Sequence, residues 1–392
     1  MINRSRAFAV GLLVLWSTFS FADKPNTVVA TIPVGNSPAG IAVTPNNLFA
    51  YVANNNNAGI PGGDTVSVLN LRNNTVEQTI SDSSFAEPYT VTINAAGTKA
   101  YVTNSGSTTV TILDLTTNTV TGTIGGFDGP TGLVTTPDGT KAYVINYGGP
   151  IVGSGNGTTV SVVDLNTNVI VGTATVGLAP AALAITPDGA YVYVVSYVDG
   201  NPGTGTISII RTSDNSVQLN AITGFSGPFA IAITPNGKYA YVTNFGSNNF
   251  SPVGTTVSVV DISTNTIAAT IPVGIQPAGI AITPAGFYAY VSNYDTLYNG
   301  PNFTDLTAYQ GTVNIIDIHT NKVISPVINV GLSPADIAIS PNGQFAYVSN
   351  YTSNTVSVIA LPFGLYDLNR LTPIYYQQLD ETINKLKQAG LL

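Results

Sequence analysis

Short stretches of apolar and hydroxyl-bearing residues fill most of the chain, and turn-forming residues interrupt them every 8–12 positions. The stretches are rich in Val, Thr, Ile and Tyr, whereas the interruptions are rich in Gly, Pro and Asn. The apolar positions lack the spacing of an amphipathic helix. This pattern is typical of β-strands joined by tight turns and predicts an all-β protein.

One strand pattern recurs along the chain as YVAN, YVTN, YVIN, YVVS, YVTN, YVSN and YVSN. The copies begin at Tyr51, Tyr101, Tyr143, Tyr193, Tyr241, Tyr290 and Tyr347. They are 42 to 57 residues apart, which is in the range of propeller blades. We expect the Tyr and Val to be apolar wedges between blades, and the Asn to cap the turn that follows.

A single repeat unit, residues 228–274, contains four strand patterns: AIAIT, YAYVTN, TTVSVVDI and TIAATIPV. A TPNGK turn joins the first two, and Gly237 supplies the positive φ that such a turn needs. Four antiparallel strands in each of seven units predict a seven-bladed β-propeller.

The two ends of the repeat region complement each other. The seventh unit ends near residue 361 after three strand patterns, without a fourth. The segment TVVATIPVG (Thr27–Gly35) nearly copies TIAATIPVG (Thr266–Gly274), which contains the fourth strand of an internal unit. We therefore expect the N-terminal strand to complete the last blade, so that neither end of the ring is left unpaired.

These motifs resemble the YVTN family of β-propeller repeat proteins. The resemblance rests on the recurring YVTN, on VGxxPxxIAxTPxG and on TVSVVDxxTNTV, and it covers about residues 27–361. The family includes surface-layer and periplasmic proteins, so the resemblance implies an exported protein with a binding or scaffold role.

The segments outside the repeats predict export and a helical tail. Arg4 and Arg6 precede the apolar run 7–19, and small residues follow up to Ala22, so residues 1–22 are interpreted as a secretory signal peptide. The propeller then spans residues 23–361. In the tail, 362–392, capping residues predict a helix over about 373–389, which would dock on the propeller or mediate dimerisation.

Composition narrows the choice of partner. Charged residues make up only 8% of the chain, and its net charge is −8, so a basic groove for nucleic acid is not expected. The absence of Cys excludes stabilisation by disulfides. No later segment is apolar enough to predict a membrane span. We expect a secreted or periplasmic protein, which could be associated with the cell surface.

The face with the longer loops is the expected binding face, because variable loops on a rigid scaffold usually carry binding residues. These loops are 54–64, 148–157, 198–205, 246–254 and 295–310. In units 3 to 7 the residue after the recurring strand is aromatic: Tyr147, Tyr197, Phe245, Tyr294 and Tyr351. The five rings could surround the channel mouth and contact a protein, peptide or glycan, or they could simply pack between blades.

Candidate catalytic residues are few. Glu87, Asp128 and Asp336 are the acids expected nearest the channel mouth, and the only histidine, His319, falls in a turn on the opposite face. No His cluster or calcium-loop motif is present, so no metal or cofactor is expected. The sequence favours an exported binding scaffold. A lactonase-like propeller hydrolase that uses these carboxylates, and a cell-surface structural protein, are the alternatives.

Overall fold

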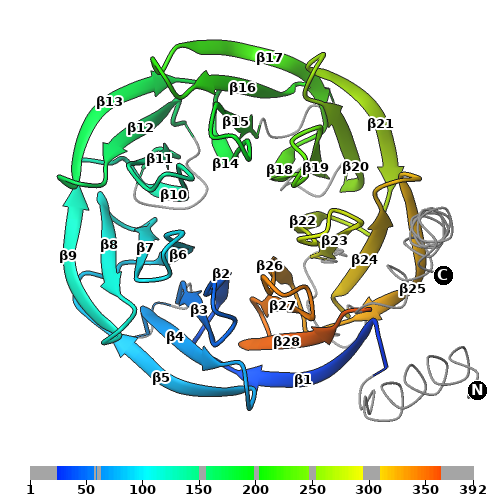
Figure 1. Cartoon of the computed structure of the whole chain (residues 1–392), viewed down its shortest axis with the longest axis horizontal. Coiled ribbons are helices and arrows are strands. Elements are labelled where there is room, and N and C mark those ends of the chain that lie inside the picture. Colours follow the sequence, from blue (N-terminus) through cyan, green and yellow to red (C-terminus); the bar gives the residue numbers. More distant parts are fainter. Residues whose placement is uncertain are drawn as a thin grey trace, which may run out of the picture.

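The structure, a computed structural model, describes residues 24–56, 59, 63–149, 156–197, 203–246, 253–294 and 310–362. The predicted signal peptide and tail helix lie outside these residues. Within them the chain forms seven four-stranded antiparallel sheets arranged as blades around a central axis, which confirms the seven-bladed propeller (Figure 1).

Each blade contributes one strand to each of four concentric layers. The innermost strands are β2 (Pro38–Val43), β6 (Pro88–Ile93), β10 (Pro130–Thr135), β14 (Pro180–Ile185), β18 (Pro228–Ile233), β22 (Pro277–Ile282) and β26 (Pro334–Ile339). The second strands are β3 (Phe49–Asn54), β7 (Lys99–Asn104), β11 (Lys141–Asn146), β15 (Tyr191–Ser196), β19 (Tyr239–Gly246), β23 (Tyr288–Asn293) and β27 (Phe345–Asn350). We number the blades 1 to 7 in this order.

The third strands are β4 (Thr65–Asn70), β8 (Thr109–Asp114), β12 (Thr159–Asp164), β16 (Gly205–Arg211), β20 (Val253–Asp261), β24 (Thr312–Asp317) and β28 (Thr355–Ala360). The outer strands are β5 (Thr75–Ser81), β9 (Thr119–Gly125), β13 (Val169–Thr175), β17 (Val217–Phe225), β21 (Thr266–Pro272), β25 (Lys322–Asn329) and, in blade 7, β1 (Thr27–Pro33).

Ring closure by the N-terminal strand is confirmed. Strand β1 pairs antiparallel with β28, in a register that runs from Thr27 opposite Ala360 to Pro33 opposite Thr355 (Figure 1). Backbone hydrogen bonds from Asn26 N to Ala360 O and from Val34 N to Asn354 O extend the pairing by one residue at each end. The two ends of the propeller region are therefore held in one sheet.

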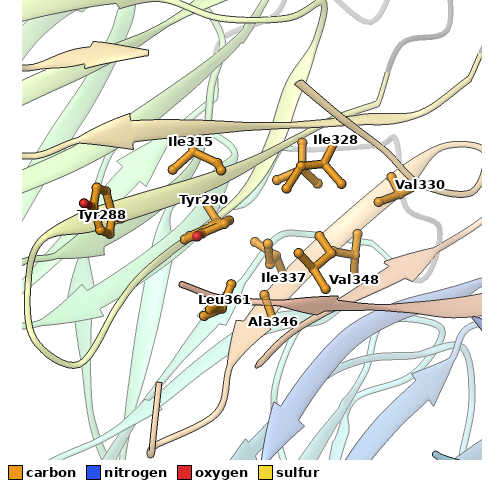
Figure 2. Close-up of a cluster of buried hydrophobic side chains, with 11 residues drawn as sticks. Tyr288, Tyr290, Ile315, Ile328, Val330, Ile337, Ala346, Val348 and Leu361 are labelled. Atoms are coloured by element: carbon orange, nitrogen blue, oxygen red, sulfur yellow. The ribbon is translucent and has the colours of Figure 1, made fainter. Parts of the chain in front are cut away.

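Apolar side chains fill the seams between neighbouring blades. Figure 2 shows the seam between blades 6 and 7, where Tyr290 and Ile315 of blade 6 pack with Ile337 and Val348 of blade 7. Second strands are buried on both faces, whereas outer strands alternate between exposed and half-buried positions and have one fully buried residue near their end. The core is therefore a set of seams rather than one central mass.

The recurring tyrosine also makes a polar contact across the seam. In blade 5 the Tyr241 hydroxyl donates to Asn321 Oδ1 of blade 6, at 2.6 Å. Equivalent bonds join Tyr51 to Asn118, Tyr143 to Asn215, Tyr193 to Asn265 and Tyr290 to Asn26. The acceptor asparagines have left-handed backbones, with φ of 53–57°. Since Asn26 directly precedes β1, the closing segment supplies this acceptor for blade 7.

The expected role of the recurring asparagine is wrong. Instead of capping the next turn, its side-chain amide ties the second strand to the third. Asn244 Nδ2 donates to the hydroxyls of Thr256 and Ser258, at 2.9 Å each. Asn54, Asn104, Asn146 and Asn350 make the same pair of bonds in their blades. In these five blades the amide therefore fixes the register at the point where the following loop begins.

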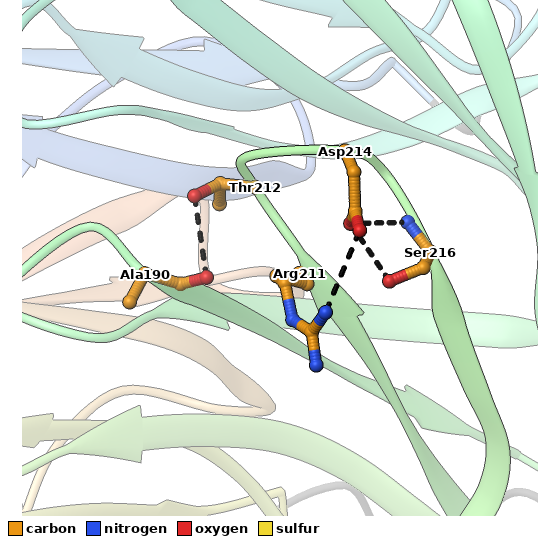
Figure 3. Close-up of polar contacts among 5 residues, drawn as sticks. All are labelled: Ala190, Arg211, Thr212, Asp214 and Ser216. Atoms are coloured by element: carbon orange, nitrogen blue, oxygen red, sulfur yellow. Dashed lines mark hydrogen bonds and ion pairs between the residues drawn. The ribbon is translucent and has the colours of Figure 1, made fainter.

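In most blades an aspartate begins the turn between the third and fourth strands. In blade 4 this position is Arg211. Figure 3 shows that Asp214 takes over the stabilising role, since its carboxylate accepts bonds from the backbone and hydroxyl of Ser216 and pairs with Arg211 at 3.5 Å. Thr212 ties the turn to Ala190 O. Asn215 keeps its left-handed backbone, so the seam bond from Tyr143 survives the sequence change.

Closure by β1 predicts a specific stability cost. Ile32 is 2% exposed and packs in the seam between blades 7 and 1. We expect Ile32→Ala to lower the free energy of unfolding by about 2–4 kcal/mol, because it opens a cavity in the closing seam. Denaturant titration measures this value, with exposed Thr31→Ala as the control. An Ile32→Ala loss as small as that of the control would contradict closure through this strand.

The tyrosine bond predicts a contrast between two seams. Tyr241→Phe removes a partly buried hydrogen bond and should cost about 1 kcal/mol of unfolding free energy. Tyr101→Phe should cost less, because the corresponding acceptor in the next blade, Asn168 Oδ1, has no partner. Parallel denaturant titrations of the two variants test the difference. Equal losses would show that the seam bond does not contribute.

Candidate functional site

The two faces of the ring differ as the sequence predicted. One face carries the tight turns between first and second strands, where Gly237 and its equivalents have φ near 70° and Asn47 has φ of 59°. The turns between third and fourth strands lie on the same face, and the exposed His319 is in one of them. The opposite face carries the inter-blade connections and the longer loops, parts of which lie outside the described residues.

A repeated backbone contact positions the residue after each second strand. Its N–H donates to the carbonyl of the residue that precedes the proline of the same blade's innermost strand, as in Tyr294 N to Gln276 O at 2.9 Å. The carbonyl-bearing residue is left-handed in every blade, with φ of 48–55°. At Gly227 a Cβ would lie 2.1 Å from Gly246 O, so glycine is required there. This contact holds seven equivalent side chains at the channel rim.

A central cavity of about 530 Å³ opens among these side chains and the beginnings of the innermost strands. All five predicted aromatic residues line it: Tyr147, Tyr197, Phe245, Tyr294 and Tyr351. They differ in exposure, however. Tyr197 and Phe245 are only 5% and 8% exposed, whereas the other three are half-buried. Tyr147 also packs against the apolar cluster between blades 3 and 4. The same five aromatic residues therefore line the cavity and pack against the surrounding blades.

The prediction missed two further aromatic residues, Tyr89 and Phe229, which line the same cavity from β6 and β18. Each directly follows the proline of its innermost strand, where most blades have Ala. That departure from the repeat is the signal that could have identified them. Tyr89 contributes a ring from blade 2, whose residue after the recurring strand, Ser105, is not aromatic.

The rings contact one another around the mouth. The ring centroids of Phe229 and Phe245 are 5.1 Å apart, and those of Phe245 and Tyr294 are 6.1 Å apart, both in tilted arrangements. The Tyr351 hydroxyl donates to Asn55 Oδ1, at 3.3 Å, which joins blade 7 to blade 1 at equivalent positions. The aromatic wall is thus held in place by packing and by a polar contact.

Asp336 is the only acidic or basic side chain among the described residues that line the cavity, if the tyrosines are set aside. Its Oδ2 accepts a hydrogen bond from Ile41 N of blade 1, at 3.1 Å, and its Oδ1 accepts one from Ile337 N, at 2.8 Å. Burial raises the pKa of Asp336 to about 6, although both backbone bonds oppose this shift. Ionisation of Asp336 therefore costs solvation free energy.

The other two predicted acids are placed differently. Asp128 is exposed, and its Oδ1 accepts a bond from Gly149 N at 3.1 Å, so it stabilises a loop. Glu87 lies beside Asp64, and burial together with that charge raises the pKa of Glu87. Neither Glu87 nor Asp128 lines the cavity. The three carboxylates do not share one lining surface.

The described residues contain no group of three or more His, Cys, Asp or Glu side chains that could hold a metal ion. Within the same residues, no helix is long and apolar enough to cross a membrane. The described lining of the cavity consists of aromatic rings, aliphatic and small residues, and a single carboxylate.

Comparison with known proteins supports the fold. No protein-family model matches the chain. It is 34% identical over 134 residues to the seven-bladed beta-propeller protein Rv1057 of Mycobacterium tuberculosis, a match that covers 33% of this chain and 32% of that protein. It is 48% identical over 59 residues to the PE-PGRS family protein PE_PGRS18 of the same bacterium, over 15% of this chain and 13% of the relative. The chain thus matches less than two thirds of the length of either relative.

Among solved structures, the chain resembles hydrazine synthase of Kuenenia stuttgartiensis, with a TM-score of 0.70 and 21% identity, over 84% of this chain and 97% of that one. At this level of identity the likeness concerns the fold alone. The comparisons and the strand topology agree on a seven-bladed β-propeller.

The raised pKa of Asp336 predicts a pH-dependent stability difference. Because the folded-state pKa, about 6, is above the ordinary value of 3.8, the protonated carboxyl favours the folded state. This contribution is fully present below the ordinary value and is lost as pH rises through 6. Asp336→Asn should therefore be more stable than the wild type at pH 8, by about 1–2 kcal/mol after screening by channel water, and no more stable at pH 3.

Thermal and denaturant unfolding from pH 3 to 8 measures this difference. Asp138→Asn is the matched control of opposite sign, because hydrogen bonds from Thr136 and Thr140 lower the pKa of Asp138. A loss of stability in Asp336→Asn at pH 8 would contradict the interpretation that desolvation raises the pKa of Asp336.

Proposed function

We propose that this chain is an exported binding protein that captures a ligand at the aromatic mouth of its central channel, on the long-loop face. The observation that carries the proposal is the cavity of about 530 Å³ lined by seven aromatic residues. Its size is typical of small-ligand or side-chain sites, and tyrosines provide large contact areas at little entropic cost. The segment interpreted as a signal peptide and the resemblance to exported YVTN repeat proteins support the export part of the proposal.

A binding role is favoured over hydrolysis by the arrangement of the acids. A carboxylate-only hydrolase needs two carboxyl groups that face one substrate position, with different protonation states. Here Asp336 lines the cavity alone, since Asp128 caps a loop and Glu87 does not line the cavity. The only histidine is in a turn on the opposite face. The ligand would be part of a protein, a peptide or a glycan.

The test is binding of the purified protein to arrays of peptides and oligosaccharides. Tyr294→Leu combined with Tyr351→Leu replaces two half-buried cavity rings. We expect this variant to lose at least tenfold in affinity for the ligands that the wild type retains, because two aromatic contact surfaces are removed from the cavity. Tyr191→Leu, which changes a half-buried tyrosine that does not line the cavity, is the control.

Circular dichroism and thermal melts first establish that both variants fold. If the wild type binds no array member, or if the cavity variant binds as well as the control, the proposed function is wrong. Sedimentation of the wild type addresses the remaining alternative, because a structural coat protein should self-assemble rather than remain monomeric.

A further inference from the structure

Seven equivalent positions surround the channel at the third residue of each innermost strand. Six of them have small side chains, and the seventh is Asp336. The other members of this ring are Gly40, Thr90, Gly132, Ala182, Ala230 and Gly279. Because Gly, Ala and Thr all satisfy the same backbone environment, packing of the blade does not demand a carboxylate at this position.

The negative charge of Asp336 has no positive partner at the site. The described residues that line the cavity include no Lys, Arg or His. Two backbone N–H groups are the donors to the carboxylate. The Asp336 side chain is half-buried at the cavity wall. A partly desolvated carboxylate without a counter-ion is costly, and carboxylates perturbed in this way are enriched at functional sites. The missing partner is therefore expected to be a cation from outside the chain.

The aromatic residues around Asp336 suit the same kind of ligand. Tyr89 and Asp336 line one cavity together with Tyr147, Tyr294 and Tyr351. Burial raises the pKa of Tyr89, and nearby charges, including that of Asp336, add to this shift. Burial raises the pKa of Tyr351, and the charges of Tyr294 and, to a lesser extent, Glu87 add to this shift. Aromatic rings attract cations, and the attraction is strongest where water is excluded. The chain's net charge of −8 would also draw cations towards it.

We propose that the cavity binds an organic ammonium group, with Asp336 as its counter-ion and Tyr89, Tyr294 and Tyr351 as its aromatic surround. This inference rests on the proposed function and specifies the ligand group that the channel mouth recognises. The ammonium group would belong to a small free amine such as choline, or to a methylated lysine side chain. Both present the same weakly hydrated cation, and the experiment below separates them.

The experiment compares choline with its uncharged isostere 3,3-dimethylbutanol by isothermal titration calorimetry on the full chain. The two probes have nearly the same shape, so a difference in affinity measures recognition of charge. We expect the wild type to bind choline at least tenfold more tightly than the isostere. Asp336→Asn keeps the shape of the side chain and should reduce this preference to less than threefold. Asp138→Asn, an acid on the opposite face, should leave it unchanged.

A second arm uses N-acetyl-trimethyllysine amide and its norleucine counterpart. Tighter binding of the lysine derivative than of choline would assign the site to a protein side chain, whereas the reverse order would assign it to a free amine. Tyr89→Leu should lower the affinity for both cations and should lower the affinity for 3,3-dimethylbutanol less, because loss of the ring removes the cation–π attraction.

Equal binding of choline and its isostere, or an unchanged preference in Asp336→Asn, would overturn the ammonium assignment. If neutral peptides or glycans from the arrays still bind in a Tyr294- and Tyr351-dependent way, only this inference fails and the proposed function stands. If no neutral ligand and no cation binds, both fail.

Discussion

Pairing of β1 with β28 is the constraint on which the rest of the structure depends. Every blade buries its second strand between two neighbours, so no blade has a complete core until the ring is closed. The pairing brings Ile32 into the last seam and Asn26 to the Tyr290 hydroxyl, so one segment supplies an outer strand, an apolar wedge and a hydrogen-bond acceptor. A ring closed in this way holds the channel residues at fixed distances without disulfides.

The channel mouth follows from the same repeat. Each blade places a left-handed residue before the proline of its innermost strand, and its carbonyl binds the N–H of the residue after the second strand. This contact does not depend on the side chain, since Asn55 and Ser105 make it as well as Tyr294 does. The scaffold therefore presents seven side-chain positions at the rim and leaves their chemistry free to vary. Aromatic residues at most of these positions, and one carboxylate just inside, turn the rim into a candidate site.

Much of this architecture could be predicted because the strand and turn pattern of a blade recurs seven times in the sequence. The strand order, the closing strand and the five aromatic residues after the second strands all followed from alignment of the units with one another. The role of the recurring asparagine did not, because Asn suits a turn cap and a strand-to-strand bond equally well by composition. Only the contacts of Asn244 with Thr256 and Ser258 distinguish the two.

Tyr89, Phe229 and the isolation of Asp336 were not predicted, for a related reason. Each of them departs from the repeat. In the sequence, a departure that contributes to a site looks the same as one that has no role. Only the structure shows which side chains line the channel together. Asp128 illustrates the other outcome, since its carboxylate turns to a loop backbone rather than to the cavity. Shared position in the repeat predicts shared backbone geometry, but not where a polar side chain points.

The central claim is that Asp336 is the counter-ion of an organic ammonium group bound in the aromatic channel. The most direct measurement is the carboxyl carbon-13 titration of Asp336 by nuclear magnetic resonance, with and without saturating choline. In the free protein the carboxyl should titrate near 6, because burial raises its pKa. Choline should lower the midpoint by about one unit or more, since a tenfold preference for the ionised form corresponds to that shift. A midpoint that choline leaves unchanged would contradict the account.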